Sequence, residues 1–423
     1  RPALLAPYRA LDLTDIKGYL CGRVLGDMGC DVIKVEPPAG DAGRTHAPFY
    51  HDVPHCERSL YWMTYNANKR SVTLDIHKAE GAALFKRLVE AADFVIESFP
   101  PGYMQELGLG YWELDRVNPG IIATSITPFG QSGPYRDYKA TDIVAQAMGG
   151  ALYITGDPDR PPVRVSFAQS YPHAGAEAAA ASLIAHYWRE ITGEGQHVDI
   201  SIQECVVWTL LNVQQFWDMA RGLVHREGSA RYIPATGAKL RQHWPCADGY
   251  VSFVVMGGTE GVGAMRALVA WLGEEGLATE EMKTIRWEEI GFGEITQEEL
   301  ERLYGPIGQL FLRHTKKELY AEALRRGIIM LAPVQTARDI LEDPQLKARG
   351  FWQEVEHPDI PGGAGQATGA TVTYPGAFIK MSATPLGIWR RAPRIGEHNR
   401  EVYEGELGLS RKELLDMKRA GVV

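Results

Sequence analysis

The runs SVTLDI at residues 71–76 and DFVIESF at residues 93–99 decide the fold of this chain. Both are rich in apolar and β-branched residues, and between them Leu84, Leu88 and Ala91 recur at helical spacing. Short apolar runs on either side of an amphipathic stretch predict a strand, a crossover helix and a second, parallel strand. Such strands are apolar on both sides, because helices cover both faces of a parallel sheet. This stretch therefore predicts an α/β fold.

The same alternation continues outward from this stretch toward both ends of the first third of the chain. Apolar, β-branched runs predict further strands at 8–14, 31–36 and 121–127. Helical spacing predicts helices at 18–28, 78–92 and 104–117. The first 135 residues are therefore expected to build a parallel sheet with helices on its faces.

The rest of the chain changes character twice. Residues 142–219 become helical and rich in small residues, which allows close helix packing. Residues 222–239 lose the apolar period and gain Gly, Arg and Ser, which predicts a linker. Residues 240–330 combine a strand at 248–255 with several helices, so we expect a smaller α+β domain there.

The composition excludes several classes of protein. The chain carries 44 Lys and Arg against 53 Asp and Glu, and the basic residues are scattered, so neither nucleic acid nor a membrane surface is an expected partner. No apolar run reaches the roughly 18 residues that a membrane-spanning helix needs. The 5 cysteines are too few and too dispersed for a disulfide framework. We therefore expect a cytoplasmic protein with reduced thiols.

Common nucleotide and metal motifs are missing from the sequence. No G-x-G-x-x-G follows the first predicted strand, and neither a P-loop motif nor H-E-x-x-H occurs. The run HDVPHC at 51–56 has unsuitable spacing for a metal site and is interpreted as a surface loop. Without G-x-S-x-G the chain also lacks the signature of a nucleophile-elbow hydrolase. No metal cofactor is expected.

Several short blocks carry a specific resemblance when they are taken in order. They are DVIKVEPP (31–38), NANKRSVTLD (66–75), DFVIESFPPG (93–102), FGQSGPY (129–135), TGDP (155–158), PPVRV (161–165), TGEGQHVD (192–199) and APRIGEHN (392–399). In this order, over nearly the whole chain, they resemble the class III coenzyme A transferases, the family of formyl-CoA transferase and of the carnitine and bile-acid CoA-transferases.

The resemblance implies a fold and a ligand. The fold is a large doubly wound parallel-sheet domain built from both chain ends, residues 1–221 and 331–423, with the smaller α+β domain inserted and two chains interlocked as a dimer. The ligand is coenzyme A or acyl-CoA, bound as a substrate at the carboxyl ends of the strands of the large domain.

The resemblance also implies which residues contact CoA. Lys69 and Arg70 match a basic pair suited to phosphates, and Lys139 matches a lysine near the site. Ser98 and Phe99 fall where the family has Asn-Phe beside the CoA tail. Two alternatives stay open: the basic pair could instead be a solvated strand edge, and Phe99 could pack in the core.

One residue that the family needs is replaced. The family's chemistry uses an aspartate that forms a mixed anhydride with the donor acyl group and then an aspartyl thioester with CoA. That aspartate lies seven residues after the arginine of P-P-x-R and four before the glycine that opens the small-residue helix. Counting from Arg164 and from Gly175 leads to Tyr171 both times. A phenol has a pKa near 10 and no acyl carbon, so Tyr171 is not expected to be the nucleophile.

The leading hypothesis is a heteromeric enzyme in which a partner subunit carries the aspartate. The succinyl-CoA:benzylsuccinate transferase of anaerobic toluene breakdown is a class III enzyme of this kind, so the chain is expected to help move CoA from a succinyl-CoA-type donor to an acid such as benzylsuccinate. One alternative is a homodimeric lyase or isomerase that uses Tyr171, His173 or Asp142 as acid or base. The other is a non-enzymatic CoA-binding scaffold.

Overall fold

The computed structural model describes residues 3–233, 236–290, 295–360 and 369–423. The chain forms two compact units, of which the larger comprises residues 1–151, 164–222 and 344–423 and the smaller residues 152–163 and 223–343. The α/β class is confirmed by a six-stranded parallel sheet with helices, and both ends of the chain contribute to the larger unit. The boundaries differ from those suggested by the sequence: the smaller unit takes in nearly all of the expected linker and continues past residue 330.

A six-stranded parallel sheet forms the centre of the larger unit within the described residues. Its strands are β1 (Arg9–Leu13), β2 (Asp31–Glu36), β3 (Lys69–Thr73), β4 (Phe94–Glu97), β5 (Ile122–Thr127) and β6 (Gln196–Ser201). Their order in the sheet is β3-β2-β1-β4-β5-β6, and every neighbouring pair is parallel. The order reverses between β1 and β4, which makes this the switch point where doubly wound sheets bind ligands.

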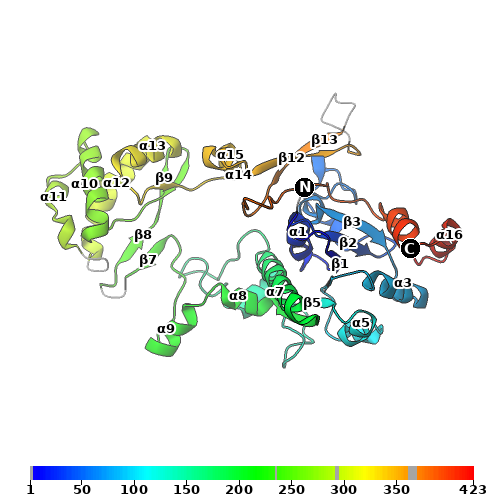
Figure 1. Ribbon diagram of the computed structural model, residues 1–423. Helices are drawn as coiled ribbons and strands as arrows, with labels where there is room; N and C mark the ends of the chain where they lie inside the picture. Colours follow the sequence, from blue (N-terminus) through cyan, green and yellow to red (C-terminus); the bar gives the residue numbers. More distant parts are fainter. Residues whose placement is uncertain (1–2, 234–235, 291–294, 361–368) are drawn as a thin grey trace. The chain divides into compact units, whose positions relative to one another are not determined.

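Each face of this sheet is covered by its own helices. Helices α1 (Tyr19–Asp27) and α7 (Ser170–Thr192) pack on one face against Ala10, Phe94 and Ile96. On the other face, helices α3 (Ala79–Val89), α5 (Tyr111–Val117) and α16 (Arg411–Arg419) contribute side chains to a second core. The strand residues in this core, such as Leu11 and Val95, alternate along the strands with those that face α1 and α7. Figure 1 shows the red C-terminal segment beside α3. Asp12 and Glu97 therefore end neighbouring strands but point to opposite faces.

Two predictions for this unit were wrong in detail. The helix expected at 104–117 is divided into α4 (Tyr103–Glu106) and α5, because Gly108 between them takes a positive φ of 66°. Strand β6 lies in a stretch that was expected to be helical. It begins after Gly193 ends α7 with a φ of 80°, and the alternation of Val198 and Ile200 in it is too short to stand out beside the long alanine-rich helix.

The other elements of the larger unit are short. The antiparallel strands β12 (Trp352–His357) and β13 (Ala370–Pro375) form a core with Met63 from α2. The remaining helices are α2 (Leu60–Asn66), α6 (Asp142–Met148), α8 (Ile202–Trp208), α9 (Val213–Ala220) and α15 (Pro344–Ala348), with a π-helical turn at Arg400–Glu406.

The smaller unit has its own core around Trp244, Phe253 and Phe311. Its strands are β7 (Ala230–Tyr232), β8 (Lys239–Arg241), β9 (His243–Cys246), β10 (Gly249–Ser252) and β11 (Ala332–Pro333). Its helices are α10 (Gly258–Glu274), α11 (Glu280–Thr284), α12 (Gln297–Arg313), α13 (Lys316–Arg326) and α14 (Ala337–Glu342). Strands β7 and β8 pair as antiparallel neighbours where the sequence predicted a linker. Among the described residues of both units, no helix has the length and apolar character to cross a membrane.

Candidate functional site

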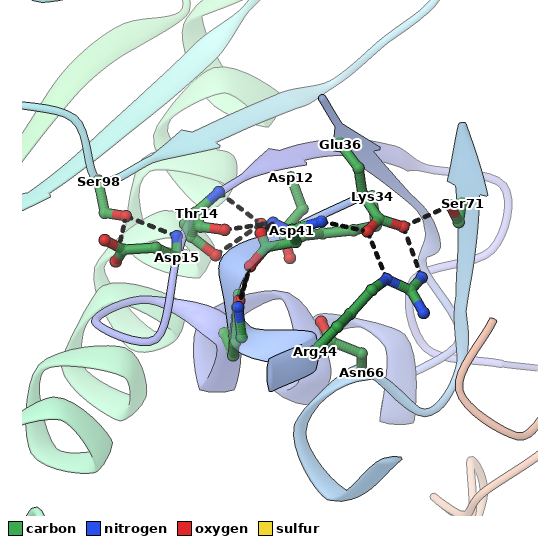
Figure 2. Close-up of polar contacts among 12 residues, drawn as sticks. Asp12, Thr14, Asp15, Lys34, Glu36, Asp41, Arg44, Asn66, Ser71 and Ser98 are labelled. Carbon is green, nitrogen blue, oxygen red and sulfur yellow. Dashed lines mark hydrogen bonds and ion pairs between the residues drawn. The ribbon is translucent and has the colours of Figure 1, made fainter. Parts of the chain in front are cut away.

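Two loops meet at the switch point, one after β1 and one after β4. The amide of Asp15 donates to Ser98 Oγ at 2.8 Å, and Ser98 Oγ donates in return to Asp15 Oδ1 at 2.9 Å (Figure 2). This reciprocal pair ties the loops side by side at the carboxyl ends of their strands. The crevice outside such strand ends is where a doubly wound sheet holds its ligand.

Lys17 adds a positive charge to this crevice. Its ammonium pairs with Asp15 Oδ2, and its backbone amide donates to Asp15 Oδ1 at 3.0 Å. Its side chain is 18% exposed, so it is not fully withdrawn into the core. Phe99 lies in the opposite loop, half-buried, and stacks on Tyr103 with ring centroids 4.6 Å apart. Phe99 packs against the core beneath α3, as the alternative interpretation of this residue expected, and the structure thus brings Ser98 together with Asp15 and Lys17.

Tyr171 lies at the start of α7, close to the same loop. Helix α7 packs tightly on α1 at Gly175, where a Cβ atom would come within 2.8 Å of Leu20 Cβ. Tyr171 is 8% exposed, and burial, followed by the negative charges of Asp142 and Asp15, raises the pKa of its phenol to about 12. The residue is therefore a neutral hydroxyl at neutral pH and not a phenolate nucleophile.

Asp142 has a structural task. Its Oδ1 accepts from the amides of Gln169 and Ser170 at 2.9 Å and from Ser170 Oγ at 2.7 Å, so it caps the start of α7. Its Oδ2 accepts from Gln146 Nε2 at 2.9 Å and lies 3.5 Å from Arg164. A carboxylate engaged in this way is poorly placed to act as a general base.

His173 does not join Tyr171. It is two positions further along α7, and residues with this spacing face different sides of a helix. Tyr171 is buried on the side of α1, whereas His173 is exposed. Lys139 is also exposed, in the loop before α6. The structure therefore gathers Ser98 and Tyr171 around Asp15, and it leaves His173 and Lys139 on the surface.

Lys69 is completely buried beneath α1. Its ammonium donates to Asp12 Oδ2 at 2.7 Å, to Asn66 Oδ1 at 2.9 Å and to the Tyr19 carbonyl at 3.0 Å. Gly22 makes room for this pair, since a Cβ atom there would lie 2.3 Å from Asp12 Oδ2. All three ammonium protons are used inside the protein, so Lys69 has none to offer to a phosphate in this conformation.

Arg70 binds carboxylates at the opposite end of the sheet. Its guanidinium contacts Asp31, Glu401 and Glu406 at 2.5–2.9 Å, and it is buried. It follows Lys69 at the amino end of β3, whereas the crevice lies at the carboxyl ends. We therefore leave this basic pair out of the candidate site. The alternative of a solvated strand edge does not fit either, because both side chains are buried.

A buried ionic network, shown in Figure 2, holds the loop after β1 from below. Lys34 donates to the carbonyl of Thr14 and lies 3.5 Å from Asp12 and 3.3 Å from Asp41. The amide and hydroxyl of Thr14 donate to Asp12 Oδ1 at 2.9 and 2.6 Å. Burial alone would raise the pKa of Asp12, but Lys34 and Lys69 hold it at about 2. Asp12 therefore stays ionised, and the network fixes the loop that carries Asp15 and Lys17.

The sequence analysis did not identify Asp12, Asp15, Lys17 or Glu97 as site residues. A signal for three of them was present, since Asp12, Asp15 and Lys17 surround the end of the first predicted strand. Polar residues at the carboxyl end of the first strand of a doubly wound sheet commonly meet the ligand. No group of three or more His, Cys, Asp or Glu in the described part of the chain is arranged to hold a metal ion.

Comparison with known proteins gives one family. The model described as CoA-transferase family III matches residues 5–399. The subunit BbsE of succinyl-CoA:(R)-benzylsuccinate CoA-transferase from Thauera aromatica is 36% identical, over 98% of this chain and 97% of its own length. The succinyl-CoA–D-citramalate CoA-transferase of Chloroflexus aurantiacus is 34% identical, over 100% and 98%. A CAIB/BAIF family protein from Brucella suis has a similar solved structure, with a TM-score of 0.79, 30% identity, and coverage of 96% of this chain and 100% of that one.

Proposed function

Because the chain belongs to CoA-transferase family III, we propose that it is the non-catalytic subunit of a heteromeric CoA-transferase in the cytoplasm. In this proposal the chain binds CoA or acyl-CoA at the crevice between the loops after β1 and β4. A partner subunit of the same family supplies the aspartate that becomes acylated.

The residues around the crevice have the chemical character that CoA binding requires. CoA carries phosphate groups and a long, flexible thiol arm, so it needs a cation and an apolar wall. Lys17 offers the cation near the loop that the buried network holds, and the ring of Phe99 offers apolar surface. Ser98 joins both loops and fixes their separation at the carboxyl ends of the strands.

The observation that carries the proposal is that, among the described residues, the carboxylates near Tyr171 are already engaged. Asp15 and Asp142 are the carboxylates whose charges reach its phenol. Asp15 is paired with Lys17 and bonded to Ser98, and Asp142 caps α7. A phenol has no acyl carbon on which a thioester can form, so the covalent steps need a residue from elsewhere.

An exposed apolar face supports the expectation of a partner chain. Helix α7 exposes Ile184, Tyr187, Trp188 and Ile191, which recur at the i, i+3, i+4, i+7 spacing of one helix face. An exposed apolar stripe of this kind marks a protein interface. The similarity to a protein named as a subunit agrees with a heteromer, which we expect to be interlocked. The named substrates of the relatives suggest succinyl-CoA as donor and a carboxylic acid such as benzylsuccinate as acceptor.

The decisive experiment compares the chain alone with the chain co-expressed with a family member that carries the aspartate. Each preparation is incubated with succinyl-CoA and a carboxylic acid acceptor, and intact-protein mass spectrometry measures covalent CoA. We expect transfer by the complex only, and a CoA adduct on the partner only. An adduct on this chain, first of all on Asp15, would contradict the proposal.

Tyr171→Phe separates this proposal from acid or base catalysis by the phenol. The substitution keeps the ring and removes the hydroxyl, so a subunit without a chemical role should leave transfer by the complex within about twofold. A lyase or isomerase that depends on this hydroxyl would lose about 10²-fold or more in kcat. CoA binding without any turnover in either preparation would favour the scaffold alternative.

A further inference from the structure

A second buried carboxylate ends β4, on the face of the sheet opposite to the ionic network. Glu97 is almost completely buried, and its Oε2 accepts the amide of Phe99 at 2.7 Å. That bond closes the turn through Ser98, the residue that ties the two crevice loops together. The conformation of Glu97 is thus connected to the crevice through one residue.

Glu97 faces a polar row that runs across the neighbouring strands. Ser125 on β5 is its register partner, and Ser125 Oγ lies 2.9 Å from His197 Nε2 on β6. Together with Tyr111 of α5, these side chains line a small, partly open pocket of about 20 Å³, which has room for roughly one water molecule. Ser125 and His197 therefore form a hydrogen-bonded pair beside Glu97, on the side toward β6.

The charges around Glu97 are unlike those around Asp12. Burial raises the pKa of Glu97 to about 7, while hydrogen bonds from Ser125 and Phe99 and the charge of Lys17 oppose this rise and Asp15 adds to it. On the other side of Ser125, burial lowers the pKa of His197, and Asp199 offsets part of that effect. Tyr111, the titratable group that α5 contributes, has a pKa raised by burial and stays neutral.

We propose that Glu97 is a proton-controlled positioning residue: as a carboxylate it locks the turn at Phe99, and as a carboxylic acid it loosens this turn. This inference rests on the proposed function only for its consequence, because the turn borders the crevice assigned to CoA. Glu97 touches no substrate in this arrangement and acts through Ser98 and Phe99.

The two states differ in the direction of their hydrogen bonds and in the position of one imidazole proton. When Glu97 is ionised, the Ser125 hydroxyl and the Phe99 amide both donate to it, and the Nε2–H of neutral His197 donates to Ser125 Oγ. When Glu97 takes up a proton from solvent, its own hydroxyl donates to Ser125 Oγ, the Ser125 hydroxyl donates to His197 Nε2, and the imidazole carries its single proton on Nδ1. The bond from the Phe99 amide then loses its charge assistance, which provides roughly half of its strength. Heavy atoms stay in place, while the turn becomes easier to open.

Hydrogen exchange of the Phe99 amide tests this directly in the full chain without CoA. Exchange is followed by mass spectrometry with residue-resolving fragmentation between pH 5.5 and 8.5, and each rate is divided by the intrinsic chemical rate. We expect protection of Phe99 to increase about tenfold with rising pH, with a midpoint near 7. In Glu97→Gln, protection of the Phe99 amide should stay at every pH at the level that the wild type shows at pH 5.5.

Two further variants make the outcome unambiguous. Glu106→Gln removes an exposed charge from the nearby α4 and should keep the wild-type pH step. Ser125→Ala removes a hydroxyl that lowers the pKa of Glu97, so the midpoint should move upward. A flat profile in the wild type, an unchanged step in Glu97→Gln, or an unmoved midpoint in Ser125→Ala would each overturn the inference.

CoA binding is measured separately on the same preparations by calorimetry. If the chain does not bind CoA but the exchange step is present, the assignment of the crevice fails and the proton-controlled turn stands. If CoA binds but the step is missing, the turn proposal fails and the crevice stands.

Discussion

Two buried carboxylates at the ends of neighbouring strands have pKa values that are shifted in opposite directions. Asp12 pairs in register with Ile96, so Glu97 lies one residue further along and on the other face of the sheet. Both are buried, yet the pKa of Asp12 is lowered to about 2 and that of Glu97 is raised to about 7. The difference comes from Lys34 and Lys69, two ammonium groups beneath α1 that have no equivalent among the hydrogen-bond partners described for Glu97. Burial alone favours the neutral acid, and only a close counter-charge reverses this preference.

The comparison shows that the loop after β1 is held by a group that stays ionised, whereas the loop after β4 is held by a group that titrates near neutral pH. Asp12 remains a carboxylate at neutral pH, and the network around it holds the loop after β1. Glu97 titrates near neutrality and holds the loop after β4. Ser98 joins these two loops, so the crevice has one rigid side and one side that responds to pH.

The strongest way to break the rigid side is Lys69→Met. The substitution leaves Asp12 buried with a single remaining ammonium neighbour, Lys34 at 3.5 Å. Loss of one partner from a buried charge pair costs about 3–5 kcal/mol, so the free energy of unfolding of the larger unit should fall by that amount. Urea unfolding followed by circular dichroism measures the loss.

Lys412→Met is the matched control for this substitution, because Lys412 is exposed on α16. It should change the free energy of unfolding by less than about 0.5 kcal/mol. Equal effects of the two substitutions would show that the buried network is not a special support.

On the pH-responsive side, Glu97→Gln should raise the free energy of unfolding, whereas Lys69→Met lowers it. The pKa of Glu97 is higher in the folded chain, so the folded state binds more protons and its stability decreases as the pH rises from about 4.5 to about 7. Gln remains neutral and avoids this loss. We expect a gain of up to about 3 kcal/mol at pH 8 and almost none at pH 4. Thermal unfolding at both pH values measures it, and a loss of stability at pH 8 would refute the contrast with Asp12.

The smallest effect belongs to the residue that joins the two sides. Ser98→Ala removes the hydroxyl that accepts the Asp15 amide and donates to its carboxylate. The uncompensated amide costs about 1 kcal/mol in unfolding free energy. Ser132→Ala, at an exposed position in a nearby loop, provides the control and should have no measurable effect. Faster hydrogen exchange of the Asp15 amide in Ser98→Ala alone would locate the effect at the crevice.

Local patterns were sufficient for much of the fold. The strands at 31–36 and 121–127 were predicted almost to the residue, because apolar β-branched runs bounded by turns are a local property. The division of the helix expected at 104–117 depends on the positive φ of Gly108, which a helical period does not reveal. Strand β6 was missed because its identity depends on pairing with β5, a contact between distant parts of the chain.

The sequence by itself determined the α/β class, the similarity to CoA-transferases and the position of Tyr171, since each depends on residue order and spacing alone. Tertiary structure decided which charges meet. Lys69 and Arg70 are adjacent in the sequence and alternate in direction on β3, so one reaches Asp12 under α1 and the other reaches carboxylates at the edge of the sheet. Charge is readable from a sequence, but its counter-charge is supplied by register and packing, and for a buried group the counter-charge decides the ionisation state.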